Sequence, residues 1–176
     1  MQNNLRFAFI GKMRSGKDTA ADYLVSKYGG KVIKFADPLY ELESLIYKYI
    51  DYPIPADKTL RRGLLQYLGT DFGRKIVDEN LWAKLMERRL LNMQGLEKLY
   101  TTDVRFSNEA LLMKDYGFKL IRVWRPEIQR IEAGATNLTH ASETSLDDFA
   151  ADYLISNIGT LEEFHQKIDK MVMELV

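Results

Sequence analysis

The chain contains no cysteine, which excludes disulfide bonds and cysteine-based metal sites and is typical of proteins in a reducing cytoplasm. It also lacks an excess of either charge, because 25 Lys and Arg residues face 25 Asp and Glu residues and the formal net charge is zero. Proteins that bind nucleic acid polymers or membrane surfaces depend on excess basic charge, so we expect neither kind of partner. A local basic cluster around a small anion is still compatible with this balance.

Long apolar segments are missing as well. The apolar run near the N-terminus is too short for a signal peptide, and no segment approaches the roughly 20 apolar residues of a membrane span. We therefore expect a cytoplasmic protein. The 176 residues, 46% of them hydrophobic, show no internal repeat and no linker, which predicts a single domain over residues 1–176.

Histidine is scarce too. The chain has two histidines, and neither stands at a spacing from carboxylates that predicts a zinc site. No Ser-His-Asp set for nucleophilic catalysis is apparent. The sequence therefore indicates neither a zinc enzyme nor a serine hydrolase.

What the sequence does contain is an alternation of short apolar runs and longer helical patterns. The runs predict strands at 5–10, 31–36, 97–103, 118–124 and 152–157. The patterns predict helices at 17–28, 38–50, 107–116 (capped by Ser107) and 160–175, and two more over 60–92 that are separated near 77–82. This alternation predicts an α/β fold in which a parallel sheet of about five strands lies between two layers of helices. In such folds ligands bind at the carboxyl ends of the strands.

The most informative stretch is GKMRSGKDT, which lies between the first expected strand and the first expected helix. Gly11, Gly16 and Lys17 match the phosphate-binding loop Gly-x-x-x-x-Gly-Lys in the strand-loop-helix context that it requires. Backbone N–H groups would face phosphate oxygens, aided by the helix dipole, while Lys17 reaches the outer phosphates. The alternative is a glycine-rich turn with a surface lysine. The residues expected to contact the phosphates are Gly11, Arg14, Ser15, Gly16, Lys17, Asp18 and Thr19.

The end of this loop is unusual. Asp18 stands where the loop ordinarily has a hydroxyl residue, and Thr19 follows one position later. One step along a helix turns a side chain by about 100°, so Thr19 is expected to address a different phosphate oxygen. Asp18 would repel phosphate unless a cation lay between them, and carboxylate oxygen is a suitable ligand for Mg²⁺. This variant favours phosphoryl transfer to a small molecule.

A second candidate site lies at the end of the strand expected at 97–103. Asp103 would lie beside the phosphate loop and hold Mg²⁺ directly or through water. Arg105 shares this strand end and has the paired donors that grip an anionic substrate. The alternative is a capping aspartate with a surface arginine.

The region 60–82 combines an apolar stripe with polar candidates. The stripe, expected to belong to the core, is Leu64, Leu65, Leu68, Phe72, Ile76 and Val77. Arg62 and Arg74 are candidates for holding a phosphate, although a helical arginine is as often solvated. Gln66 has the donor and acceptor needed to read a base edge.

A fourth region, 124–143, carries Arg125 and Arg130 and a polar run that includes His140. It is typical of a mobile cover that closes over phosphates and excludes water. The alternative is a surface loop with a solvated histidine.

Together these stretches resemble the deoxynucleoside monophosphate kinases of bacteriophages, a branch of the P-loop kinases. The resemblance covers nearly the whole chain. It rests on GKMRSGKDTAADYL at 11–24, FADPLYE at 35–41, RRGLLQYLGTDFGR at 61–74, DVRFSNEA at 103–110, LIRVWRP at 120–126, HASE at 140–143 and DYLISNIGTLEE at 152–163. It implies a three-layer α/β/α P-loop kinase fold and transfer of the γ-phosphoryl group of ATP to a (deoxy)nucleoside 5′-monophosphate.

The resemblance also implies roles for single residues. Lys17 would act on the transferred group, Asp103 would organise Mg²⁺, and Arg125 and Arg130 would act from a short lid at about 124–146. The residues around the acceptor would be Asp37, Arg62, Arg74 and Arg105, with an acceptor-binding helical region at about 38–92. A homodimer that serves phage DNA synthesis in the host cytoplasm is implied as well.

Two alternatives stay open. Kinases for other phosphorylated metabolites share this scaffold: animal-type phosphomevalonate kinases have the loop and an Asp-x-Arg motif like that at 103–105, and dephospho-coenzyme A kinases have the general plan. A nucleotide-dependent switch protein is the alternative of a different class, against which the chain has no Asn-Lys-x-Asp base-reading motif.

Overall fold

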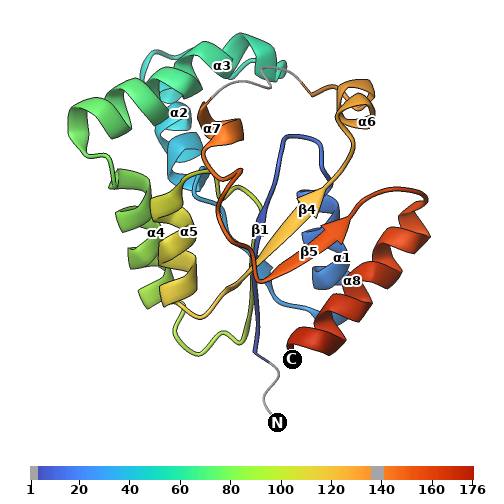
Figure 1. Ribbon diagram of the computed structural model, residues 1–176. Helices are drawn as coiled ribbons and strands as arrows, with labels where there is room; N and C mark the ends of the chain where they lie inside the picture. The colour runs from blue at the N-terminus through green and yellow to red at the C-terminus, as the bar shows by residue number, and fades with distance from the viewer. Residues whose placement is uncertain (1–3, 136–140) are drawn as a thin grey trace. The chain divides into compact units, whose positions relative to one another are not determined.

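The computed structural model describes residues 4–135 and 141–176 (Figure 1). Contacts between Cα atoms divide the chain into two compact units. The sheet unit comprises the residues up to Ile33 together with Gln94–Val176, and the helical unit comprises Lys34–Met93. Within the described parts of the chain, no helix is both long and apolar enough to cross a membrane.

The sheet unit contains five parallel strands in the order β2-β3-β1-β4-β5. Their bounds are β1 Leu5–Ile10, β2 Lys31–Val32, β3 Lys98–Thr101, β4 Lys119–Trp124 and β5 Tyr153–Ser156. Phe7 of β1 is in register with Tyr100 of β3 and with Lys119 of β4. All five expected strands are confirmed, although β2 is shorter than its apolar run.

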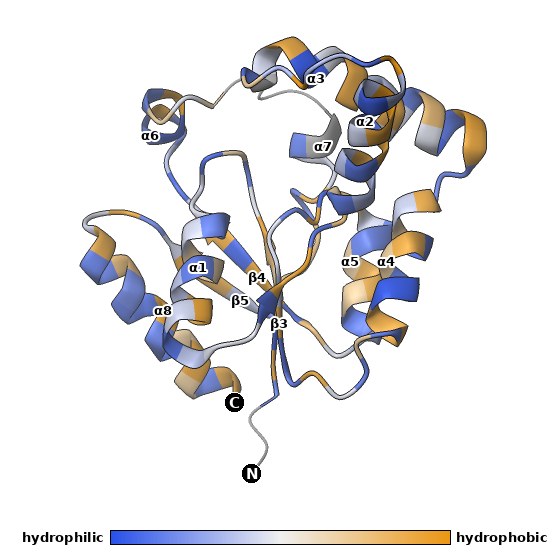
Figure 2. Ribbon diagram, turned by 180° about the vertical axis from the view of Figure 1, so that it is seen from behind, coloured by the Kyte–Doolittle hydropathy of each residue, from blue (hydrophilic) through white to orange (hydrophobic). Residues whose placement is uncertain are grey.

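Helices cover both faces of this sheet. Helices α1 (Lys17–Tyr28) and α8 (Leu161–Leu175) lie on one face and α5 (Ser107–Asp115) lies on the other (Figure 1). Because side chains alternate along a strand, Phe7 and Phe9 pack with α1 and α8 in one buried cluster, while the intervening Ala8 faces α5. Hydrophilic and hydrophobic residues mix along α1 and α8 in Figure 2, as expected for helices with one buried side. The expected three-layer α/β/α fold is confirmed.

The strand order determines where a ligand can bind. The chain runs from the central β1 to β2 and β3 on one side, and later to β4 and β5 on the other. Ligands in open α/β sheets bind at such a reversal, at the carboxyl ends of the strands. The loop after β1 and the residues that follow β3, β4 and β5 therefore lie at the edge where a site is expected.

Two local expectations about helix ends in the sheet unit need correction. Ser107 is the first residue of α5 and not its cap, because Phe106 holds the cap position. The buried Glu109 closes this end by accepting hydrogen bonds from the backbone N–H groups of Arg105 and Phe106, at 2.8 and 3.2 Å. Two short helices, α6 (Glu127–Glu132) and α7 (Ala141–Thr144), also occur in the stretch that was expected to form a loop.

The helical unit contains α2 (Asp37–Tyr49), α3 (Lys58–Gln66), a π-helix η1 (Tyr67–Val77) and α4 (Leu81–Leu91). Asp57 caps α3, since its Oδ1 accepts a hydrogen bond from Thr59 N at 2.8 Å. The expected break near 77–82 is confirmed between η1 and α4.

The predicted apolar stripe of this unit is wrong in its second half. Leu68 is buried and Leu64 and Leu65 are partly buried, but the three later members, Phe72, Ile76 and Val77, are exposed within this chain. The prediction assumed α-helical spacing, whereas each hydrogen bond in η1 spans five residues, so side chains with α-helical spacing no longer share a face.

Trp82 of α4 packs against the π-helix and fixes its position. Its Nε1 donates a hydrogen bond to Gly69 O at 2.7 Å. A Cβ atom on Gly73 would lie 2.7 Å from the Trp82 ring, so only glycine fits there.

Candidate active site

The phosphate loop after β1 needs its two glycines for steric reasons. Gly11 and Gly16 have φ values of 135° and 108°, which side chains of L-residues rarely adopt. A Cβ atom on Gly11 would lie 2.4 Å from Val123 O, and one on Gly16 would lie 2.4 Å from Asn157 Nδ2. The loop is therefore held between the ends of β4 and β5 at distances that exclude any side chain.

Asn157 braces this loop, and the sequence analysis missed it. Its Nδ2 donates a hydrogen bond to Ser15 O at 2.8 Å, and its own backbone N–H donates to Trp124 O at 2.7 Å. The only signal in the sequence was its place as the last residue of an expected strand, at the edge where ligands bind.

The loop turns polar groups inward. Arg14 has a positive φ of 60°, and Ser15 is buried with an exposed fraction of 1%. The Ser15 hydroxyl oxygen has no hydrogen-bond partner within the described residues. Because an unsatisfied buried polar atom costs about 1–3 kcal/mol, this hydroxyl points to a polar ligand, and α1 begins at Lys17 with its positive end toward the same loop.

Lys17 lies at the centre of a group of charges. It is 8% exposed, and its Nζ donates hydrogen bonds to Gly11 O at 2.7 Å and Lys12 O at 2.8 Å. Burial, followed by the positive charge of Arg105, lowers the pKa of Lys17 from 10.5 to about 8. The charges that oppose this shift belong to Glu143, Asp18 and Asp103.

Asp18 and Asp103 are oriented by threonines at the end of β3. Thr102 Oγ1 donates to Asp18 Oδ1 at 2.7 Å, and Thr101 Oγ1 donates to Asp103 Oδ1 at 3.2 Å. Both carboxylates act on the pKa of Lys17, so both lie close to the phosphate loop. Thr19 is exposed on the first turn of α1.

These carboxylates fit a magnesium ion that takes most of its ligands from substrate. Mg²⁺ prefers oxygen ligands and is commonly bound through one or two carboxylates with phosphate and water. No group of three or more His, Cys, Asp or Glu side chains suited to a metal occurs among the residues that the structure describes. An all-protein metal cage is therefore absent from that part of the chain, while Asp18 and Asp103 supply the donor type that Mg²⁺ requires.

Arg105 is held by two glutamates that the sequence analysis did not single out. Glu109 accepts from its backbone N–H, and Glu143 Oε1 accepts from its Nη1 at 2.5 Å. Glu143 is buried on α7, and its Oε2 also accepts from Met13 N at 2.6 Å. The segment 141–147 thereby contacts both the phosphate loop and Arg105, which lies in the connection between β3 and α5.

Arg125 lies just before α6 and Arg130 lies within it. Arg125 Nη1 donates to Arg14 O at 3.4 Å. Arg130 is 5% exposed, and its Nε and Nη1 have no hydrogen-bond partner within the described residues. Its Nη2 lies 3.6 Å from a carboxylate oxygen of Glu127. A buried guanidinium with unsatisfied donors favours an anionic ligand. His140 lies outside the described residues.

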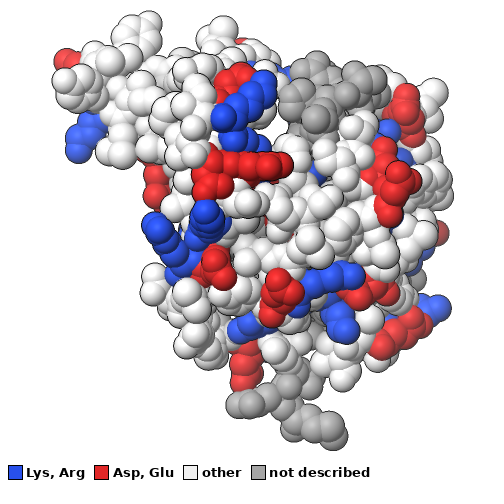
Figure 3. Space-filling model, turned by 60° about the vertical axis from the view of Figure 1, so that its left-hand side comes forward, with Lys and Arg blue, Asp and Glu red and all other residues white. Residues whose placement is uncertain are grey.

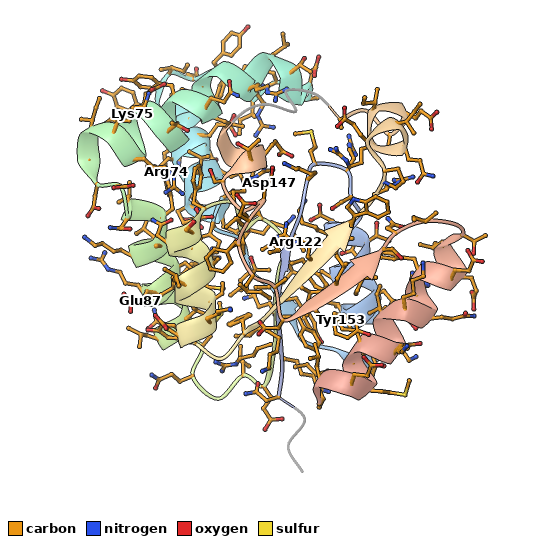
Figure 4. The ribbon with its side chains drawn as sticks, viewed as in Figure 1. Arg74, Lys75, Glu87, Arg122, Asp147 and Tyr153 are labelled. Atoms are coloured by element: carbon orange, nitrogen blue, oxygen red, sulfur yellow. The ribbon has the colours of Figure 1, made fainter. Side chains whose placement is uncertain are left out.

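The remaining predicted residues belong to the helical unit. Asp37 Oδ2 accepts hydrogen bonds from Lys34 N at 3.1 Å and from Arg89 Nη1 at 2.8 Å. Arg62 and Gln66 lie on α3, and Gln66 is exposed. Arg74 lies on η1 (labelled in Figure 4) and donates to Glu79 O at 3.0 Å. The Asp37 contact joins the start of α2 to α4, and the Arg74 contact joins η1 to the turn before α4, so both also stabilise this unit.

Arg61, next to Arg62, makes a contact that the sequence did not indicate. Its Nε donates to Glu43 Oε1 at 2.7 Å, and its Nη2 donates to Glu43 Oε2. Glu43 is fully buried, so this bidentate pair connects α2 with α3. On the face drawn in Figure 3, basic and acidic side chains lie beside one another, in accord with the zero net charge.

Comparison with known proteins identifies the family. The sequence pattern described as "Deoxynucleotide monophosphate kinase" matches residues 52–168. A putative deoxynucleotide monophosphate kinase of Acanthamoeba polyphaga mimivirus is 32% identical over 90% of this chain and 91% of its own length. The deoxynucleotide monophosphate kinase of Escherichia phage RB69 is 30% identical over 63% of this chain and 44% of its own length.

The fold also matches solved kinase structures. Shikimate kinase from Aquifex aeolicus superimposes with a TM-score of 0.56 at 16% identity, covering 97% of each chain. This likeness shows the P-loop kinase fold, and the sequence matches show the family. The resemblance stated from the motifs is thereby confirmed, and the chain belongs to the deoxynucleotide monophosphate kinase family.

Proposed function

We propose that the protein transfers the γ-phosphoryl group of ATP to a (deoxy)nucleoside 5′-monophosphate, giving ADP and a (deoxy)nucleoside diphosphate. The observation that carries this proposal is the phosphate loop, in which Gly11 and Gly16 tolerate no side chain and Lys17 is buried beside the backbone. The names of the relatives support a monophosphate acceptor.

The donor phosphates are assigned to the residues from Gly11 to Thr19. The backbone N–H groups and the positive end of α1 attract the triphosphate, and the Ser15 hydroxyl, which has no partner among the described residues, gains one. Lys17 exchanges its bonds to two loop carbonyls for bonds to phosphate.

Asp103 and Asp18 would hold Mg²⁺ directly or through water. When bound, the ion would neutralise charge on the phosphates and align the transferred group. The threonines that donate to both carboxylates keep them oriented toward this task.

The acceptor is assigned to basic and polar residues. In the helical unit these are Asp37, Arg62, Gln66 and Arg74. In the sheet unit Arg105 would contact an anionic group of the acceptor. These roles rest on residue type and on the family, and each is open to substitution tests.

The reaction needs little covalent participation by the protein. An oxygen of the acceptor phosphate attacks the γ-phosphorus, the bond from that phosphorus to the β,γ-bridging oxygen breaks, and ADP leaves with the bond electrons. The acceptor phosphate is already ionised near neutral pH, so no strong general base is required. Catalysis is alignment and charge neutralisation, in which Lys17, Arg105, Arg125 and Arg130 are the proposed participants.

Water must be kept from accepting the phosphoryl group. We assign this task to residues 124–146, whose described part includes α6 with its buried Arg130. This covering role predicts that hydrolysis of ATP without acceptor is slow.

The proposal is tested by measuring ADP formation from ATP and Mg²⁺ with each common deoxynucleoside monophosphate, its ribose counterpart, or no acceptor. Turnover that depends on one or more monophosphates is expected. Turnover that no nucleoside monophosphate accelerates would contradict the proposal and favour a kinase for another phosphorylated metabolite or a switch protein.

A further inference from the structure

One buried carboxylate already occupies contacts that a substrate phosphate would use. Glu143 Oε2 accepts from Met13 N at 2.6 Å, within the phosphate loop. Its Oε1 accepts from Arg105 Nη1 at 2.5 Å. Its charge also acts on Lys17. A backbone N–H, an arginine and a lysine form the donor set that binds a phosphoryl group in P-loop kinases.

The ammonium group of Lys17, the other main donor of the loop, also donates to acceptors of the protein itself. Lys17 Nζ donates to the loop's own carbonyls, Gly11 O and Lys12 O. Met13 N–H, Lys17 Nζ and Arg105 Nη1 thus all donate to acceptors of the protein itself.

The position of Glu143 is fixed from a second side. Lys12 Nζ donates to Glu143 O at 2.7 Å and pairs with Asp147 at 2.5 Å. Asp147, labelled in Figure 4, follows α7 and is partly exposed. Two consecutive loop residues, Lys12 and Met13, therefore hold the segment that carries this carboxylate.

We infer that Glu143 is an internal occupant of the phosphate site, which holds Met13 N–H and Arg105 in the nucleotide-free protein and yields them to substrate phosphate. The inference rests on the proposed function. A carboxylate and a phosphate compete for the same donors, and they repel each other if both remain. Glu143 therefore lowers the affinity for phosphate compounds while it stabilises the empty site.

This role has a signature that a purely structural residue lacks. Replacing a residue that only supports the loop weakens both folding and ligand binding. Replacing an internal competitor weakens folding but strengthens ligand binding. Glu143→Gln is the suitable change, because it preserves the size of the side chain and removes its charge.

The matched control is Asp147→Asn. It removes one negative charge from the same segment, also beside the loop, but the Asp147 carboxylate pairs with Lys12 and is 45% exposed. A general electrostatic effect would change the affinity for phosphate compounds by the same factor in both variants.

The experiment is isothermal titration of wild type and both variants with inorganic tripolyphosphate and with ATP, without Mg²⁺, together with their melting temperatures. We expect Glu143→Gln to bind both compounds roughly tenfold more tightly and to melt at a lower temperature. Asp147→Asn should stay within about twofold of wild type. Unchanged or weaker binding by Glu143→Gln, an equal gain in Asp147→Asn, or no binding by any of the proteins would overturn the inference.

Failure of the proposed function would look different. If no monophosphate accelerates ADP formation, yet Glu143→Gln binds tripolyphosphate more tightly than wild type, the role of Glu143 is supported and the proposed acceptor is contradicted. If monophosphates accelerate turnover but Glu143→Gln binds ATP and tripolyphosphate no more tightly than wild type, the kinase activity is supported and the role of Glu143 is contradicted.

Discussion

Lys17 is predicted to take up a proton when nucleotide binds at mildly alkaline pH. Burial and the charge of Arg105 lower its pKa to about 8 in the free protein. A triphosphate beside Nζ stabilises the charged form and returns the pKa toward its ordinary value. Linkage then requires about half a proton to be taken up per bound ATP at pH 8, about 0.9 at pH 9 and about 0.1 at pH 7.

The same linkage sets the pH dependence of affinity and of stability. Between pH 8 and the ordinary pKa of 10.5, affinity for ATP should fall by up to about tenfold per pH unit. Over this window the unfolded chain binds more protons at Lys17 than the folded chain does. Lys17 therefore makes the free energy of unfolding rise with pH over this window. Below pH 8 its buried charge lowers the free energy of unfolding by roughly 3 kcal/mol.

The assay is calorimetric titration with ATP at pH 7, 8 and 9 in pairs of buffers with different ionisation enthalpies, from which proton uptake follows directly. Adenosine, which has no phosphate, serves as the control ligand and should cause no uptake. Arg105→Gln should raise the pKa of Lys17 and reduce the uptake at pH 8, because it removes a neighbouring positive charge. Uptake below about 0.1 proton at both pH 8 and pH 9 would refute this reasoning.

Three further substitutions, one of them with a matched control, test the site. Lys17→Met should lower phosphoryl transfer at least about 100-fold without lowering the melting temperature at pH 7, because a costly buried charge is removed; a large loss of stability would count against it. Gly11→Ala should destabilise the fold by about 1–3 kcal/mol and abolish ATP binding, since its Cβ would lie 2.4 Å from Val123 O. Gly29→Ala, which also has a positive φ but meets no atom within 4 Å, should cost less in denaturant unfolding and leave ATP affinity unchanged. Arg130→Met should raise the melting temperature, because it removes buried donors that have no partner in the described parts of the chain, and lower kcat at least about tenfold; unchanged kcat would remove Arg130 from the site.

The phosphate loop was predictable because its requirements are local. Gly11 and Gly16 are required because their backbone angles are rare for other residues and because neighbouring atoms leave no room for a Cβ atom. Both glycines lie within nine consecutive residues, so the motif can be recognised in the sequence. The strands were predictable for a similar reason, since each is a short apolar run with a turn signal beside it.

The residues that support the loop were not predictable, because their contacts join distant parts of the chain. Met13 meets Glu143 across 130 positions, and Ser15 meets Asn157 across 142. Nothing near Glu143 in the sequence indicates a buried carboxylate. The prediction of the apolar stripe in the helical unit was wrong for another reason. A π-helix changes the angle between successive side chains, and amino-acid composition alone does not predict a π-helix.

The proposed reaction is phosphoryl transfer from ATP to a nucleoside monophosphate. It is tested most directly by incubating the protein with γ-³²P-labelled ATP, Mg²⁺ and a mixture of deoxynucleoside monophosphates, and separating the products, with Lys17→Met in parallel. The account predicts label in a deoxynucleoside diphosphate with wild type and none with Lys17→Met. Label found only in inorganic phosphate, or left in ATP, would contradict it.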